Sequence, residues 1–217
     1  MIEIGKVEHA TYSPNGCSIS PHLALEEIGK TFETERIVIS ETQTSTYLNI
    51  NPKGKTPVLV LDDGTVITEN PIILQYLART NPECNLLPAD TKSEYKALQI
   101  SEYFSNTVHN FGLTRLFRPQ FFCSSEASWE GIRKDGEEVV LKAFNLIAPR
   151  LEGTTFLFDQ FSVADASVFF FEMQASRLKI AMPAPVQSHF EMLLSRPATQ
   201  RVFAREGLDK AAYLPIR

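Results

Sequence analysis

The sequence lacks the features that mark several classes of protein. No window holds a dense run of Lys and Arg, and the formal net charge is −5, so neither nucleic acid nor an anionic membrane is an expected partner. No apolar stretch is long enough to span a membrane, and the segment 1–6 has no apolar core of the kind found in secretion signals. We therefore expect a cytoplasmic protein without a membrane partner.

Cysteine is scarce. The chain of 217 residues has three, Cys17, Cys84 and Cys123. An odd number at irregular spacing favours reduced thiols over a disulfide framework or a zinc site. No bound metal is expected.

The first 80 residues alternate between strand-like and helix-like patterns. Two β-rich runs, 7–12 and 33–39, flank apolar residues at helical spacing that end before Gly29, which predicts a β-α-β unit. Residues 57–68 then predict a hairpin around an Asp-Gly turn. A helix follows from Asn70, with Asn70 as its N-cap and Pro71 at its first position. This order predicts a shortened thioredoxin-like α/β domain with a mixed four-stranded sheet.

The remaining residues predict helices only. A polar, proline-punctuated stretch, 81–90, is typical of a linker. Helical periodicity then starts near Asp90 or Thr91 and continues to Phe111, and it returns over 129–151, where Pro149 should kink or end the helix. Ser162 to Asp165 is typical of a capping box that opens another helix. We expect an α/β domain at 1–80, a linker at 81–90 and an all-α domain at 91–217.

Cys17 is the first candidate for chemistry. It follows a Pro and Gly turn at a predicted helix start, where partial positive charge on the first N–H groups favours the nucleophilic thiolate. The alternative is that Cys17 packs as a small buried hydrophobe, which is the role expected for Cys84 and Cys123.

Two further segments suggest a ligand site. Pro57 opens a strand that should be interior, although proline cannot donate to a ladder. A cis Thr56–Pro57 bond would leave the Thr56 backbone free to pair with an extended peptide ligand, whereas a trans proline would mark an ordinary surface turn. The helix start at Asn70 could hold a carboxylate and Glu69 an ammonium group, although a plain capped helix start is the alternative.

These motifs, in this order, resemble those of the cytosolic glutathione transferases. The resemblance covers essentially the whole chain, and the cysteine motif is similar to that of the bacterial beta class. Four segments carry it: Ser13–His22, Asn51–Leu59, Thr68–Ala78 and Phe161–Asp165.

The resemblance implies a role for each matching residue. Cys17 would be the active-site thiol beside the sulfur of glutathione, and Thr56, next to Pro57, would pair its backbone with the cysteinyl part. Glu69 and Asn70 would bind the γ-glutamyl head, and His109 would reach the site from the helical domain. A lone helical histidine is otherwise more often structural or solvent-facing. The resemblance also implies a homodimer.

Two departures from the family pattern concern the site. Asn70 stands where the family usually has serine, and the segment 40–49 contains no Lys or Arg to help hold glutathione. We expect binding to survive the larger Asn70, with a weaker hold on the glycyl carboxylate.

The expected function is a glutathione S-transferase that passes the glutathione thiolate to small apolar electrophiles or to disulfides, in detoxification. The alternatives are a non-catalytic ligand-binding or interaction protein on the same fold, and a glutathione-dependent thiol-disulfide reductase or peroxidase. Aromatic residues between Phe111 and Phe122, including Phe117 and Phe121, could line the electrophile site, although core packing is the more common role for such rings.

Overall fold

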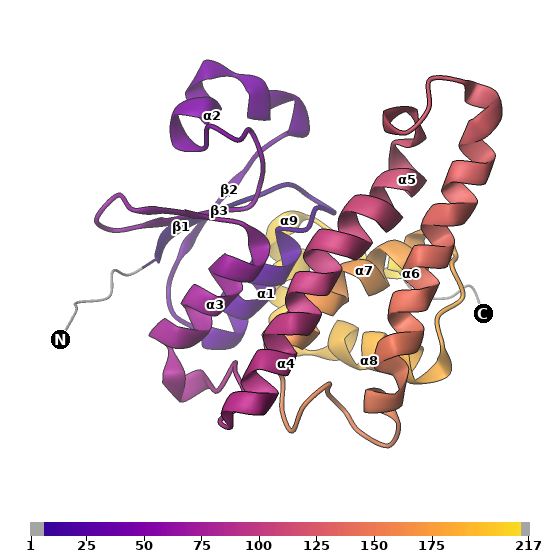
Figure 1. Cartoon of the computed structure of the whole chain (residues 1–217). Helices are drawn as coiled ribbons and strands as arrows, with labels where there is room; N and C mark the ends of the chain where they lie inside the picture. The colour runs from indigo at the N-terminus through magenta and orange to yellow at the C-terminus, as the bar shows by residue number, and fades with distance from the viewer. Residues whose placement is uncertain (1–6, 214–217) are drawn as a thin grey trace.

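The computed structural model describes residues 7–213, and a four-stranded mixed sheet occupies the N-terminal part (Figure 1). The strand order is β2-β1-β3-β4, with β1 parallel to β2 and antiparallel to β3, and β3 antiparallel to β4. The strands are β1 (Val7–Tyr12), β2 (Glu33–Arg36), β3 (Val58–Leu61) and β4 (Val66–Thr68). The predicted thioredoxin-like sheet is confirmed. The segment 1–6, on which the expected lack of a secretion signal rests, lies outside the described residues.

Nine α-helices accompany the sheet within the described residues. Three belong to the N-terminal part: α1 (Ile19–Ile28), α2 (Ser45–Ile50) and α3 (Asn70–Thr80). Six follow: α4 (Thr91–Glu102), α5 (Thr114–Phe117), α6 (Trp129–Leu151), α7 (Val163–Leu178), α8 (Ala184–Ser195) and α9 (Pro197–Glu206). No strand follows β4 among the described residues, so the predicted helical second half is confirmed. No helix of this part of the chain has the length and apolar character needed to cross a membrane.

The two faces of the sheet are covered by different helices. Helices α1 and α3 lie on one side and α2 on the other (Figure 1). Leu59 and Leu61 of β3 pack into the main core, whereas Val58 and Val60 pack with Tyr47 of α2 in a second cluster. Because both faces are covered, β3 is buried along its whole length. The sequence did not predict α2 or the 3₁₀ turn Ile39–Gln43 before it.

Several predicted boundaries are corrected by the structure. Strand β2 ends at Arg36 rather than at residue 39. Asn70 is not the N-cap of α3 but lies within the helix, and the capping position is taken by Glu69, whose side chain makes no capping hydrogen bond. Pro149 lies in the last turn of α6, which ends two residues later at Leu151.

The long helix predicted through residue 111 changes its winding. Helix α4 ends at Glu102, and Tyr103–Leu113 is π-helical before α5 begins. Where this segment meets α6, Gly112 and Gly136 come very close, since a Cβ atom on Gly136 would lie 2.7 Å from the Gly112 carbonyl oxygen. Single π-turns often mark functional positions in helices, and this segment carries His109.

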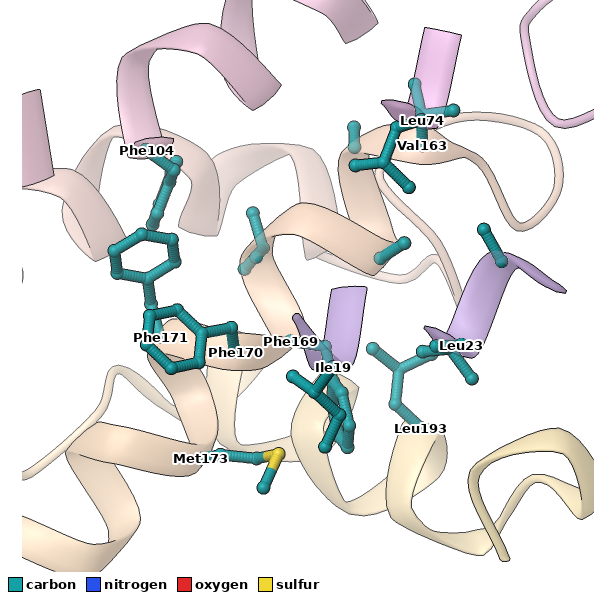
Figure 2. Packing of buried hydrophobic residues seen from close by; sticks show 14 of the residues in the cluster. Ile19, Leu23, Leu74, Phe104, Val163, Phe169, Phe170, Phe171, Met173 and Leu193 are labelled. Carbon is teal, nitrogen blue, oxygen red and sulfur yellow. The ribbon is translucent and has the colours of Figure 1, made fainter. Parts of the chain in front are cut away.

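One apolar core joins the two halves of the chain. Helix α1 is buried from Ile19 to Glu26, and α7 is buried from Val163 to Ala175. Figure 2 shows side chains of α1 and α7 within the same cluster, together with Leu74 of α3 and Leu193 of α8. Because this core is continuous, the boundaries at residues 80 and 91 stay a prediction.

Buried and half-buried ion pairs also connect α1 to α9. His22 of α1 lies 2.8 Å from the Glu206 carboxylate, with both side chains almost fully buried. Glu26 pairs with Arg201 at 2.5 Å and with Arg205 at 2.6 Å. These pairs hold the C-terminal helix against the helix that begins beside Cys17.

The helical half buries a second histidine between two carboxylates. His189 of α8 lies 2.7 Å from Glu172 and 3.0 Å from Asp165, both on α7. Burial alone would lower the pKa of His189, but Glu172 and Asp165 outweigh burial and raise it to about 10. Asp165 also accepts from the Ser162 N–H at 2.8 Å, so the predicted capping box is confirmed.

We predict that His189→Ala lowers the free energy of unfolding by about 3–5 kcal/mol, because removing one partner leaves buried carboxylates uncompensated. The double variant His189→Phe, Glu172→Leu should recover most of this loss. Since the folded-state pKa of His189 is raised from 6.5 to about 10, its contribution is complete below pH ~6.5 and is lost as pH rises through ~10. Urea unfolding at pH 6, 8 and 10 measures both effects, and equal losses at all three values would contradict the second.

Candidate active site

The turn from Ser13 to Cys17 connects β1 to α1. Within it, the Gly16 N–H donates to the Ser13 carbonyl at 2.8 Å. The Ser18 hydroxyl accepts from the Ser13 N–H at 3.1 Å and donates to the Ser13 carbonyl at 3.3 Å. A side chain that would otherwise cap α1 therefore closes the turn instead, and the Cys17 backbone is held at the helix start.

Side chains from the helical half of the chain form hydrogen bonds to the same turn. Gln174 of α7 donates from Nε2 to the Asn15 carbonyl at 3.0 Å, and the Tyr213 hydroxyl donates to Asn15 Oδ1. Asn15 has a φ of 61°, in the left-handed region that asparagine tolerates better than most residues. The position of Cys17 therefore depends on contacts from both halves.

The Cys17 sulfur faces the segment before β3. Its thiol lies 3.8 Å from the Thr56 carbonyl oxygen, and the Thr56–Pro57 peptide bond is cis, as predicted for the ligand-pairing alternative. The Lys55 carbonyl beside it accepts from the Tyr47 hydroxyl at 2.8 Å and from Asn51 Nδ2 at 2.6 Å. The backbone next to Thr56 is thus held by buried side chains.

The start of α3 completes this side of the site. Asn70 donates from Nδ2 to the Cys17 carbonyl at 2.8 Å. Glu69 before it has a φ of 72°, a strained value for a residue with a Cβ atom. Its carboxylate is exposed and pairs with Lys53 Nζ at 2.7 Å, and Lys53 also donates to the Thr68 hydroxyl at 2.8 Å.

The expectation that the helix start favours a Cys17 thiolate is wrong. The pKa of the thiol is raised to about 11, mainly by burial and also by Glu69, while a backbone hydrogen bond and Lys55 lower it by less. Within the helix start, the Ile19 N–H donates to the Gly16 carbonyl and the Ser20 N–H to the Cys17 carbonyl. The backbone therefore lowers the pKa of the thiol by less than burial raises it.

His109, which the resemblance places at the site, lies in the π-helical segment Tyr103–Leu113. Its ring packs edge-on against Phe170 and Phe171, with centroids 5.5 and 6.1 Å away. The pKa of His109 is lowered to about 4, mainly by burial and also by the positive charges of Lys55 and Arg118. Lys55 acts electrostatically on both His109 and the Cys17 thiol.

Three cations of this region were not predicted as site residues. Lys53 and Lys55 lie within the motif around Thr56, and Arg118 follows the helical segment that carries His109. The sequence signal was Pro52-Lys53-Gly54-Lys55, directly before Thr56. The segment 40–49 has no cation, but two lysines a few residues later bring positive charge to the site.

The aromatic residues after His109 are not core residues. Phe111, Phe117, Phe121 and Phe122 are 48%, 46%, 66% and 39% exposed, so the expectation of core packing is wrong for them. Arg115 stacks over Phe122 at 4.4 Å and Arg118 over Phe121 at 5.5 Å. Arg118 also acts electrostatically on His109.

The structure thus gathers the predicted residues around one sulfur. Thr56 and Asn70 contact Cys17 directly, Pro57 forms the cis bond, and Glu69 acts on the thiol electrostatically. Cys84 and Cys123 are free and half-buried. Among residues 7–213, no group of three or more His, Cys, Asp or Glu side chains is arranged to hold a metal ion. The assembled groups can bind an extended, charged thiol peptide.

We predict that Cys17 of the free protein reacts slowly with iodoacetamide at pH 7.5. Its pKa near 11 instead of 9.0 leaves about a hundredfold less thiolate than an ordinary cysteine has. Glu69→Gln should shift the pH midpoint of alkylation down, since it removes a negative charge that raises the pKa of the thiol. Mass spectrometry of the Cys17 peptide gives the rates, and a midpoint below 9 in the unchanged protein would contradict the prediction.

We predict that His109 is neutral throughout pH 5.5–8, because its pKa is lowered to about 4. Lys55→Met should raise the pKa of His109, since it removes a positive charge that opposes protonation. Titration of the histidine ring protons by NMR measures both values, and His109→Gln assigns the signal. A His109 midpoint near 6.5 would show that the ring is not buried as described.

Comparisons with known proteins agree with this geometry. The family model for the N-terminal domain of glutathione S-transferases matches residues 16–80. The chain is 31% identical to glutathione S-transferase GstA of Escherichia coli O157:H7, over 91% of this chain and 98% of that protein.

Solved structures extend the similarity to nearly the whole chain. A sphingomonad glutathione S-transferase complexed with glutathione is 28% identical, with a TM-score of 0.77 over 93% of this chain and 100% of that one. A beta class glutathione S-transferase of Sphingomonas chungbukensis is 26% identical, with a TM-score of 0.78 over the same shares. With the site geometry and these similarities together, the chain belongs to the glutathione S-transferase family of enzymes.

Proposed function

We propose that the protein binds glutathione against Cys17 and transfers the glutathione thiolate to a small apolar electrophile. One observation carries the proposal: the Cys17 sulfur, the Thr56 carbonyl and the start of α3 meet at one place, with 3.8 Å and 2.8 Å contacts made by Cys17. A sphingomonad relative with bound glutathione supports the choice of ligand.

Glutathione offers groups that match this arrangement. The backbone of Thr56, held beside Pro57, pairs with the cysteinyl part as a short strand would. The first N–H groups of α3 at Asn70 receive the γ-glutamyl carboxylate. Glu69 takes the ammonium group, and for this Lys53, now 2.7 Å from its carboxylate, has to share or leave it.

Positive charge compensates for the cation missing from 40–49. Lys55 acts on both Cys17 and His109, so it lies where the glutathione sulfur and the second substrate would meet. It stabilises anionic groups of the bound peptide, including the thiolate. Lys53, once released from Glu69, is a second source of charge for a carboxylate.

The chemical step is displacement at carbon. The glutathione thiolate attacks the electrophilic carbon, a C–S bond forms, and the leaving group departs with its electron pair. Cys17, protonated because its pKa is raised, serves as a hydrogen-bond donor to the attacking sulfur. Neutral His109 offers a ring nitrogen at the helical side, and the exposed aromatic rings near Arg118 form the apolar surface for the second substrate.

The raised pKa of Cys17 favours conjugation over thiol-disulfide exchange. In conjugation the nucleophile is the sulfur of glutathione, whereas in exchange it is a thiolate on Cys17 itself. A thiol with a pKa near 11 supplies little of that thiolate at neutral pH. Exchange, reductase or peroxidase activity is therefore the second candidate, and ligand binding without catalysis the third.

The remaining expectations belong to the same proposal. A beta class relative of matching length supports assignment to that class. We further propose a homodimer that works in the cytoplasm in detoxification, with no resident metal and with neither nucleic acid nor a membrane as partner. The net charge of −5 supports the last point.

We predict that Cys17→Ser and Cys17→Ala keep conjugation of glutathione to 1-chloro-2,4-dinitrobenzene within about tenfold, the worth of one hydrogen bond. Reduction of bis(2-hydroxyethyl) disulfide should fall to background in both variants, because it needs the sulfur of Cys17. Cys84→Ser is the matched control and should change neither activity.

Binding is tested separately by retention on immobilised glutathione and by mass spectrometry after incubation with glutathione disulfide. In that reaction the Cys17 thiolate displaces one glutathione thiolate and keeps the other half as a mixed disulfide. Absence of retention, adduct and conjugation together would overturn the proposed function. Equal loss of conjugation and reduction in the Cys17 variants would make the cysteine essential to both.

A further inference from the structure

The Asn70 side chain points toward the turn Ser13–Cys17, which we call the thiol turn, rather than toward a ligand. Its Nδ2 atom donates to the Cys17 carbonyl at 2.8 Å, across 53 residues of sequence. We infer that Asn70 is a positioning residue for Cys17, and that it couples the γ-glutamyl end of the glutathione site to the thiol. This inference rests on the proposed function, since it assumes that the glutathione sulfur arrives at Cys17.

The amide is poorly suited to bind the γ-glutamyl carboxylate itself. One of its two N–H donors is already engaged with Cys17, and its other polar atom, Oδ1, is buried without a hydrogen-bond partner among the described residues. Oδ1 can only accept a hydrogen bond, so it would repel a carboxylate. The backbone N–H groups of the α3 start, rather than the side chain, are therefore left to hold that end of the ligand.

A hydrogen bond to the Cys17 carbonyl restricts where the Cys17 sulfur can lie. Three bonds separate the carbonyl carbon from Sγ, so fixing the carbonyl fixes the direction of the Cα–Cβ bond. The other donor to this carbonyl among the described residues is the Ser20 N–H, at a longer 3.2 Å. Gln174 and Tyr213 grip the turn two residues earlier, at Asn15. Asn70 thus holds the Cys17 backbone from outside the turn, while Thr56 contacts the sulfur itself.

The length of the side chain matters to this contact. A serine hydroxyl ends one atom sooner along the side chain than the Nδ2 atom of asparagine. From the same backbone it would fall short of a 2.8 Å contact by about one bond length, outside hydrogen-bond range. An aspartate has the size of asparagine but carries no donor, and it would place a charge against the carbonyl. Substitutions of Asn70 by alanine, serine and aspartate therefore test separately the size of the side chain, its reach and its ability to donate a hydrogen bond.

The test compares Asn70→Ala, Asn70→Ser and Asn70→Asp in conjugation of glutathione to 1-chloro-2,4-dinitrobenzene. We expect kcat to fall about tenfold in all three, as for loss of one neutral hydrogen bond, while KM for glutathione stays within about threefold. An acidic residue at a helix start is favourable, which offsets part of the repulsion from the Cys17 carbonyl in Asn70→Asp. Thermal unfolding of all three variants verifies that each is folded under the assay conditions.

A readout without glutathione tests the contact directly. The pH midpoint for alkylation of Cys17 by iodoacetamide should move up in Asn70→Asp, which brings a carboxylate beside Cys17, and not in Asn70→Ser. Asn85→Gly is the matched control, since Asn85 also donates to a backbone carbonyl, that of Glu83 at 3.2 Å, and its φ of 51° suits glycine. It should change neither kcat nor the midpoint.

The outcomes separate the two claims. If the unchanged protein neither binds nor conjugates glutathione, the proposed function fails. If the unchanged protein is active but the Asn70 variants raise KM while keeping kcat, Asn70 is a glutathione ligand and the inference fails alone. Unchanged kcat, KM and alkylation in all three variants would also overturn it.

Discussion

Burial of α1 on every side is the constraint on which the site depends. The helix lies between the sheet and the helical half, and Ile19 to Glu26 are all buried. Apolar side chains face α3 and α7, while His22 and Glu26 reach charged partners on α9. A helix packed in this way cannot shift without disturbing both halves. The thiol turn at the N-terminal end of α1 is therefore fixed as well. A few further hydrogen bonds, at Asn15 and Cys17, are enough to hold it in place.

The same burial explains the electrostatics of the site. A thiol close to the core loses contact with water, so the charged form becomes costly and the pKa of Cys17 rises. His109 responds in the opposite direction, because its charged form is the protonated one. Both groups are consequently neutral near pH 7. The charges that remain are Glu69, Lys53, Lys55 and Arg118, at the margins of the site, where they can exchange internal partners for those of a charged ligand.

Much of the fold was predictable, because its signals are local. The Asp-Gly turn, Gly29 after α1 and the Ser162 capping box each act within a few residues. The positions of Cys17, Thr56 and Glu69 in the site followed from motif order. The pKa of Cys17 could not be predicted from motif order, because it depends on burial by residues distant in sequence. The direction of the Asn70 amide was equally hidden, since its partner lies 53 residues away, and the π-helical winding around His109 has no local signal.

These properties together assign different tasks to the two sulfurs. A nucleophile must be a thiolate, and the protein's own thiol, with its pKa near 11, is held as a donor. In the function proposed above, the thiol of glutathione comes from solvent and lies near Lys55, so its ionisation is less opposed than that of the buried Cys17. Cys17 can then donate a hydrogen bond to the arriving thiolate, which an ionised cysteine could not do without charge repulsion. On this argument, the burial that weakens Cys17 as a nucleophile is what suits it to support one.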